Sequence, residues 1–266
     1  MKIAMTIAAI WVFSVSANAQ KMMTWKEIYR INCKAVVQIY VGDTFRGTGF
    51  IVSSDGVILT ANHVVTTRES RLRQYASDIK VLVNGNDTPY PAIPLPAEVS
   101  DDQVNYDSAL VKITATDLPH VALGDWSKID IGDPLVMISS FPGMGCIMLQ
   151  GMVSSKAAFL TPLGPKPVNT LLFQCPVRNG FSGAPIFDSL GRVVAIVDTK
   201  VFGIAPALDE LRSKWFDSPV RVLFNRIDIG STNVELINNL DQNLISDLGS
   251  GIDVSYAKRE QESEKK

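Results

Sequence analysis

The chain has 266 residues and a formal net charge of −2 at pH 7, with 25 Lys and Arg against 27 Asp and Glu. This balance offers no basic face to a nucleic acid. The length suits one domain with short appendages and leaves little room for a second recognition domain.

Residues 1–19 have the pattern of a secretory signal peptide. Lys2 is the charged start, Ile3–Val15 the apolar run, and Ala17-Asn18-Ala19 a small-residue cleavage site. We therefore expect a mature chain that begins at Gln20 and is exported, either periplasmic or secreted. The alternative is an uncleaved membrane anchor, but the apolar run is shorter than the roughly 18 to 20 residues that span a bilayer.

Residues 20–32 form an N-terminal helical segment, because Thr24-Trp25-Lys26-Glu27 is a capping-box pattern. Strands are predicted at Ala35–Val41 and Gly47–Val52.

The segment Thr66–Asn105 then contains the apolar run Val81–Val83 and a proline-rich loop, Pro89–Pro96. A segment of this length either shapes access to a cleft or is a surface insertion without a role.

The second half of the chain also has short apolar runs separated by turn signals. Six strands are predicted there, at Leu135–Ser139, Ile147–Ser154, Thr170–Val177, Ala184–Asp188, Val193–Val197 and Val220–Ile227. Many short strands with few helical periods predict an all-β fold, a double β-barrel with short flanking helices.

Two helices are predicted near the end of this domain, which we place at residues 33–249. Pro206–Phe216 has an apolar face. It is either a helix near the cleft that controls whether the active site is ordered, or a surface insertion without a role. Thr232–Leu248 has a capping residue, an apolar stripe and Gly249 to end it. Residues 250–266 are charged and predicted to be a disordered tail.

Three residues that could perform nucleophilic catalysis occur in a defined order. Ser182 lies between two glycines where an apolar run turns sharply, His63 ends one apolar strand, and Asp107 precedes another. A serine becomes a nucleophile only with a histidine in hydrogen-bond reach and a carboxylate that orients it. The order His, Asp, Ser is that of the chymotrypsin-type double barrel.

Several ordered motifs resemble the trypsin-like serine peptidases of the HtrA/Deg type. The resemblance covers most of the mature chain and is carried by Gly47–Val52, Asp55–Thr60, Val121–Asp125, Ile131–Val136, Phe141–Gly143, Gly151–Ser154 and Gly191–Val197. That family usually continues into a PDZ domain, whereas this sequence ends first, so we expect no PDZ domain.

The resemblance implies a serine endopeptidase that acts on polypeptides through His63, Asp107 and Ser182. The backbone N–H groups of Gly180 and Ser182 are the expected oxyanion donors. Phe181 stands where digestive enzymes have the acid that pairs with a new N-terminus, so activation by clipping is not expected.

The resemblance also implies a substrate pocket lined by Pro176, Val177, Ala195 and Val197. Pro176 is six residues before the serine, where an aspartate would select Lys or Arg, and none of the four is charged. Burying a cation without a partner costs several kcal/mol. Cleavage after small or medium apolar residues is therefore expected.

The cysteines are Cys33, Cys146 and Cys175. Cys146 and Cys175 flank the predicted hairpin around Leu160–Pro167, which predicts a bridge between them; the alternative is three free thiols. No Cys/His spacing indicates zinc, and a triad needs neither metal nor cofactor.

Two other classes of function stay open. The first is a double barrel that binds other molecules without catalysis. The intact triad makes this class less favoured but does not exclude it. An α/β-hydrolase esterase is disfavoured because Ala184 replaces the second glycine of its motif and the triad order differs.

Overall fold

A computed structural model describes residues 21–67, 74–96, 107–160 and 167–200, together with 223–224, 227–228 and 246–253. The predicted signal peptide, the helix Pro206–Phe216 and the segment 229–245 lie outside these residues. Within the described ranges, no helix combines the length and the apolar character needed to cross a bilayer.

The first described element is the helix α1 (Trp25–Asn32), as its capping box predicts. The Thr24 hydroxyl accepts a hydrogen bond from the Glu27 N–H, and the Glu27 carboxylate accepts one from the Thr24 N–H at 2.7 Å. The hydroxyl and backbone N–H of Thr24 lower the pKa of Glu27. The 3₁₀ turn η1 (Cys33–Ala35) then leads directly into the first barrel.

The first barrel is a closed antiparallel sheet. Its strands, in spatial order, are β1 (Val36–Val41), β2 (Thr44–Ile51), β3 (Val57–Ala61), β8 (Ser108–Ile113), β7 (Tyr90–Leu95) and β6 (Ile79–Val83). Between β3 and β6 lie the short helix α2 (Asn62–Val65) and a small hairpin, β4 (Thr66–Thr67) with β5 (Gln74–Tyr75).

The prediction of a proline-rich loop at Pro89–Pro96 is wrong, because Tyr90–Leu95 form the strand β7. Along this strand the pairing changes partner: Pro91 pairs with Lys80 of β6, whereas Pro94 pairs with Val111 of β8. Each proline thus has a paired neighbour on one side only, and a strand tolerates the missing N–H at such a position.

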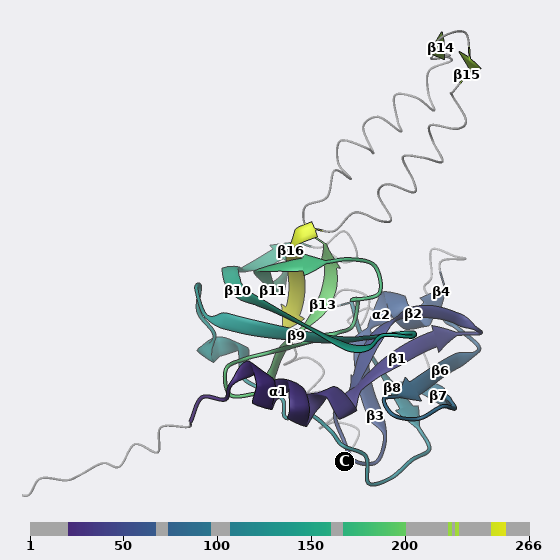
Figure 1. The fold of residues 1–266 in the computed structure, drawn as a ribbon. Coiled ribbons are helices and arrows are strands. Elements are labelled where there is room, and N and C mark those ends of the chain that lie inside the picture. Colours follow the sequence, from purple (N-terminus) through teal and green to yellow (C-terminus); the bar gives the residue numbers. More distant parts are fainter. Residues whose placement is uncertain are drawn as a thin grey trace, which may run out of the picture.

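The second barrel is also closed. Its strands, in spatial order, are β10 (Gly145–Leu160), β11 (Pro167–Val177), β16 (Ser246–Asp253), β13 (Val193–Lys200), β12 (Pro185–Phe187) and β9 (Pro134–Phe141). The 3₁₀ turn η2 (Trp126–Lys128) precedes it. The fold is therefore the all-β double barrel expected from the sequence. Figure 1 shows the two barrels side by side, with α1 below β9 and leading toward β1.

The last strand of this barrel differs from the prediction at Val220–Ile227. There, β14 (Leu223–Phe224) and β15 (Ile227–Asp228) form a separate two-stranded sheet, and the barrel is closed by β16. Leu248 and Gly249, predicted to end a helix, and residues 250–253, predicted to begin a disordered tail, belong to β16. This strand pairs with β11 on one side and β13 on the other, so tertiary pairing overrides its poor strand propensity.

The two barrels share apolar packing. One buried cluster fills the first barrel and continues into β9, β12 and β13 through Val136, Ile138, Phe187, Val193 and Ile196. A second cluster fills the interior of the second barrel. Because the first cluster crosses between the barrels, their relative position is set by core packing.

Buried polar contacts also cross between the barrels. The Thr48 hydroxyl of β2 lies 2.7 Å from the Ser139 hydroxyl of β9, and Gln38 Nε2 donates to Ser140 Oγ at 3.1 Å. All four side chains are buried. Buried polar groups are costly unless paired, so these contacts help to select one arrangement of the two barrels.

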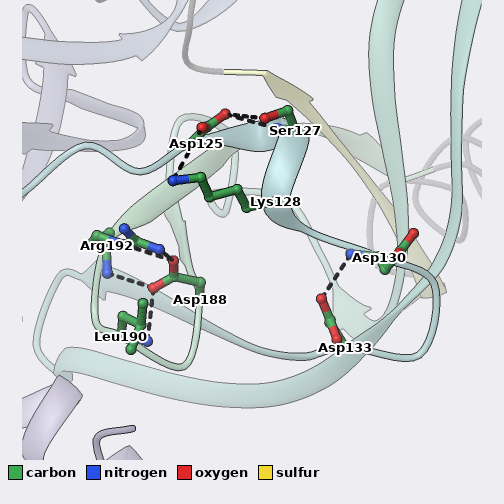
Figure 2. Close-up of polar contacts among 8 residues, drawn as sticks. All are labelled: Asp125, Ser127, Lys128, Asp130, Asp133, Asp188, Leu190 and Arg192. Atoms are coloured by element: carbon green, nitrogen blue, oxygen red, sulfur yellow. Dashed lines mark hydrogen bonds and ion pairs between the residues drawn. The ribbon is translucent and has the colours of Figure 1, made fainter. Parts of the chain in front are cut away.

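The turn from β12 to β13 is held by a buried carboxylate. Asp188 accepts hydrogen bonds from the backbone N–H groups of Leu190 and Arg192, and its Oδ2 lies 2.7 Å from Arg192 Nη2. Figure 2 shows these contacts, with the Asp125–Ser127 cap of η2 in the same view. The turn thus fixes how the chain leaves β12 and returns in β13.

Candidate active site

His63 and Asp107 are brought together by two adjacent strands of the first barrel. Ala61 of β3 pairs with Ser108 of β8, so α2 starts beside the residue that enters β8. His63 Nδ1 lies 2.5 Å from Asp107 Oδ2, and the His63 backbone N–H donates to Asp107 Oδ1 at 3.0 Å. Both carboxylate oxygens therefore hold the histidine.

The pair is asymmetric in its exposure. The Asp107 side chain is 1% exposed and the His63 side chain 31%. Asp107 has φ 42, a left-handed conformation that aspartate adopts more readily than most residues. The carboxylate is thus locked beneath an imidazole that still reaches the surface.

Several contacts determine the ionisation of Asp107. Burial by itself raises the pKa of this carboxyl group, but hydrogen bonding to His63 and its charge, with a side-chain hydrogen bond to Asp198, hold the pKa below its usual value. Asp107 is therefore a carboxylate at neutral pH, in position to orient the imidazole and to stabilise its charged form.

Ser182 lies in the turn that joins β11 to β12 and is anchored to the first barrel. Its carbonyl accepts the Thr48 backbone N–H at 2.9 Å, and its hydroxyl donates to the Asp198 carbonyl at 3.4 Å. Among the described residues, the hydroxyl of Ser182 thus bonds to the Asp198 carbonyl and not to the His63 ring. Such contacts are often long without substrate.

Gly183 explains why this turn sits so close to β2 and β3. It has φ +82, and an added Cβ would lie 2.1 Å from the Thr48 carbonyl oxygen and 2.3 Å from Thr60 Oγ1. Only glycine fits this position, which brings the serine against the first barrel.

Some backbone N–H groups around the serine donate hydrogen bonds within the protein and others do not. Those of Phe181, Gly183 and Ala184 donate to the carbonyls of Arg178, Val197 and Phe181. Those of Gly180 and Ser182 have no protein acceptor within the described part of the chain. Gly180 has φ +94, as a type II turn requires at its third residue. The N–H groups of Gly180 and Ser182, on either side of the bonded Phe181 N–H, can thus donate to a ligand.

Aromatic rings from both barrels cover this turn. Phe45 of β2 and Phe141 of β9 have ring centroids 5.6 Å apart, and Phe141 contacts Phe181 at 5.1 Å. The Arg178 guanidinium lies over Phe141 at 5.0 Å. An added Cβ at Gly180 would lie 2.6 Å from Phe141, so the rings pack directly against the bare backbone.

Asp198, at the end of the apolar run in β13, was missed as a site residue. The side-chain ligand atoms of His63, Asp107 and Asp198 lie within 4.8 Å of one another. Asp198 contacts Ser182 through its carbonyl and Asp107 through its carboxyl group. The available signal was an acid directly after five apolar residues, Val193–Val197, next to the expected pocket wall.

Among the residues that the structure describes, these three are also the group of side chains close enough together to hold a metal ion. However, His63 Nδ1 and Asp107 Oδ2 are 2.5 Å apart, a hydrogen-bond distance. Two ligands of one zinc ion, each about 2.0 Å from the metal, stand roughly 3 Å apart. The geometry therefore suits an acid–base pair better than a metal site.

The pocket residues named from the sequence lie in different environments. Pro176 is exposed at the end of β11, and Val177 next to it is buried. Ala195 and Val197 are completely buried in the core of the second barrel. That these four residues line a substrate pocket stays a prediction.

The cysteines also differ from the expected bridge, since Cys33, Cys146 and Cys175 are all free. Cys175 packs against Gly151 of β10, where an added Cβ would lie 3.2 Å from its Cβ. Cys146 is five residues away along the same strand, about 16 Å at 3.3 Å per residue. A disulfide needs Cα atoms about 4.4 to 6.8 Å apart, so Cys146 and Cys175 are too far apart for one.

A family model described as the trypsin-like peptidase domain matches residues 47–196. This range is more than half of the chain and includes His63, Asp107 and Ser182. The chain belongs to the trypsin-like peptidases. Members of this family are serine endoproteases and hence hydrolases.

Relatives of this trypsin-like peptidase include proteins named "Probable periplasmic serine endoprotease DegP-like". The one from Pseudomonas putida is 33% identical over 152 residues, which cover 56% of this chain and 28% of that protein. The one from Brucella suis is 30% identical over 160 residues, which cover 59% and 28%. The chain thus spans less than a third of the length of these relatives over the match.

Solved structures agree on the fold. An HtrA-type protease, AlgW, determined with a tripeptide, has a TM-score of 0.62 at 20% identity and covers 89% of this chain and 62% of that one. A serine endoprotease from Yersinia pestis has a TM-score of 0.57 at 22% identity, covering 91% and 66%. At these identities the likeness shows the double barrel alone.

Proposed function

We propose that this chain is an HtrA-like serine endopeptidase that cleaves polypeptides through His63, Asp107 and Ser182. The observation that carries the proposal is the buried Asp107 carboxylate, which accepts hydrogen bonds from both Nδ1 and the backbone N–H of His63. This contact keeps Nδ1 protonated and directs Nε2 outward as the base, which is the geometry a serine nucleophile requires.

In the proposed reaction, Ser182 Oγ attacks the carbonyl carbon of the scissile peptide while His63 Nε2 takes the hydroxyl proton. Collapse of the tetrahedral intermediate breaks the C–N bond, and His63 returns the proton to the leaving amine. A water molecule, deprotonated by the same nitrogen, then hydrolyses the acyl-enzyme. Asp107 stabilises the imidazolium in both halves and keeps its own charge.

The negative charge that develops on the former carbonyl oxygen needs donors in place before reaction. The N–H groups of Gly180 and Ser182 have no protein acceptor among the described residues, and we assign them to the oxyanion. Removing one such donor typically lowers turnover by about 10²-fold or more. The packing of Phe141 and Phe45 against Gly180 supports this role, because it fixes the turn that carries both N–H groups.

For specificity, we propose cleavage after small or medium apolar residues. The support is that none of the residues predicted to line the pocket, Pro176, Val177, Ala195 and Val197, carries a charge. A peptide library digested with the mature enzyme measures this preference. A profile dominated by Lys or Arg at the cleavage position would contradict it and leave the proposed triad untouched.

We also propose that the protein is exported. The support is the signal-peptide pattern of residues 1–19 and the word "periplasmic" in the names of its relatives. N-terminal sequencing of protein recovered from its native host should find Gln20 first. A chain that still starts at Met1 would contradict cleavage.

The proposed chemistry is tested by labelling the mature protein with a fluorophosphonate and by assaying casein cleavage. Ser182→Ala should lose the label and nearly all turnover, and His63→Ala nearly all turnover, with thermal unfolding unchanged. Because triad residues act as a unit, the double variant should be scarcely slower than either single one. A folded wild type that neither takes the label nor cleaves casein would favour the idle binding barrel.

A further inference from the structure

Two cysteines that are 113 residues apart in sequence meet where the two barrels join. Cys33 follows α1 and begins η1, immediately before β1 of the first barrel. Cys146 lies near the start of β10 in the second barrel, opposite Ser140 of β9. Neither belongs to the candidate active site.

The two thiols are within reach of each other. Cys146 Sγ donates to the Cys33 carbonyl at 3.2 Å. Asn84 Nδ2 lies 3.1 Å from Cys33 Sγ and 3.4 Å from Cys146 Sγ, so a single amide group contacts both sulfurs. Burial, followed by hydrogen bonding to the Cys33 thiol, raises the pKa of Cys146. Both residues are only partly buried, so a small oxidant can reach them.

The third cysteine provides the contrast. Cys175 is 2% exposed within the second barrel, and burial raises the pKa of its thiol to about 12. A thiol reacts as its thiolate, which burial disfavours. Burial raises the pKa of Cys146 as well, so what separates Cys175 from the other two is its near-complete burial, which keeps an oxidant away from its sulfur.

We propose that Cys33 and Cys146 form a disulfide that links the first barrel to the second when the protein meets a small-molecule disulfide such as oxidised glutathione. One protein thiolate attacks the glutathione disulfide and releases one glutathione thiolate. The second protein thiolate then attacks the protein sulfur of the mixed disulfide and releases the other. The two protein thiols lose two electrons and two protons, and glutathione disulfide is reduced to two glutathione thiols.

The bond would close a loop that contains the whole first barrel. It would also fix the start of the β9–β10 hairpin, five residues after Phe141, which packs on the Ser182 turn. Loop closure of this length constrains the unfolded chain strongly, so the oxidised form should melt at a higher temperature. The proposal does not depend on peptidase activity.

The test uses the full-length mature protein with Ser182→Ala, to prevent self-cleavage, equilibrated in glutathione buffers and mapped without reduction. We expect a Cys33–Cys146 peptide, one titratable thiol in place of three, and a Tm raised by about 5 °C or more. Both thiols remaining alkylatable in excess oxidised glutathione, or a link to Cys175, would overturn the proposal.

Matched variants separate the disulfide from a mere change in packing. Cys33→Ser and Cys146→Ser should each abolish the difference in Tm between oxidised and reduced protein, while Cys175→Ala keeps it. A difference that persisted in Cys33→Ser would also overturn the proposal. If one serine variant fails to fold, the other and the peptide map still decide.

Discussion

Asp198 places a second carboxyl group beside Asp107 at the candidate active site. A side-chain hydrogen bond joins the two groups and is one of the contacts that hold the pKa of Asp107 below its usual value. Asp198 thus helps to hold the Asp107 carboxylate in position. It touches no reacting atom through its side chain and is a positioning residue.

Asp198→Ala should lower kcat/KM by about tenfold or more, because a hydrogen bond to a charged group is worth about 1.5 to 3 kcal/mol. Asp198→Asn retains a neutral N–H donor and should stay within about threefold of wild type. Profiles of kcat/KM against pH measure both variants. Equal losses in Asp198→Asn and Asp198→Ala would contradict a donor role.

Asp107 predicts a dependence of stability on pH. A carboxyl group with a lowered folded-state pKa stabilises the fold fully above its unfolded pKa of about 3.9, and that contribution is lost as pH falls through the folded-state pKa. The Tm difference between wild type and Asp107→Asn should therefore be largest near neutral pH and shrink in acid.

Thermal unfolding across this range measures the effect. Asp87→Asn, which removes an exposed acid, is the control for net charge and should show little difference at any pH. A Tm difference for Asp107→Asn that stayed constant down to strongly acidic pH would show that the carboxylate does not contribute through its charge.

Among the elements, the β12–β13 turn connects the candidate nucleophile to Asp198. Ser182 precedes β12 and Asp198 lies in β13, so the turn that joins these strands controls their separation. The Asp188 carboxylate organises it by accepting hydrogen bonds from Leu190 N–H, Arg192 N–H and the Arg192 guanidinium.

Asp188→Ala should lower the free energy of unfolding by about 2 kcal/mol, because it leaves buried donors unpaired and a partly buried arginine without its partner. Urea unfolding measures this. Ser189→Ala lies in the same turn, and its side chain makes no hydrogen bond to any residue that the structure describes, so this variant should be close to neutral. Comparable losses for the two variants would mean that the carboxylate is not what stabilises the turn.

For the whole molecule, the site depends on how the barrels meet. His63 and Asp107 come from the first barrel and Ser182 from the second. Thr48 of β2 is completely buried and spans the junction: its hydroxyl contacts Ser139 and the Gly180 carbonyl, and its N–H donates to the Ser182 carbonyl.

Thr48→Val keeps the shape but removes the hydroxyl, so Ser139 and the Gly180 carbonyl lose a partner. Stability should fall by about 1 to 3 kcal/mol, and kcat should fall with it because the serine turn is less firmly held. Thr44→Val, at an exposed position of the same strand, is the control. Unchanged kcat in a destabilised Thr48→Val would separate the junction from catalysis.

The sequence by itself determined the class of fold and the pairing of His63 with Asp107. Short apolar runs bounded by turn residues are local signals, so the strands β1, β2, β9 and β13 and the capped helix α1 could be located directly. The order of histidine, aspartate and serine carried enough information to name the double barrel before any contact was known.

Only the tertiary structure decided the remaining features, because each depends on residues distant in the chain. The strand β7 forms despite its prolines since its partner changes along its length, and β16 forms despite its glycines since it pairs on both sides. Asp198 is an ordinary strand-end acid until the fold brings it to Asp107. Likewise Cys146 meets Cys33 and not Cys175, because barrel closure and packing, which no local pattern encodes, determine which thiols are neighbours.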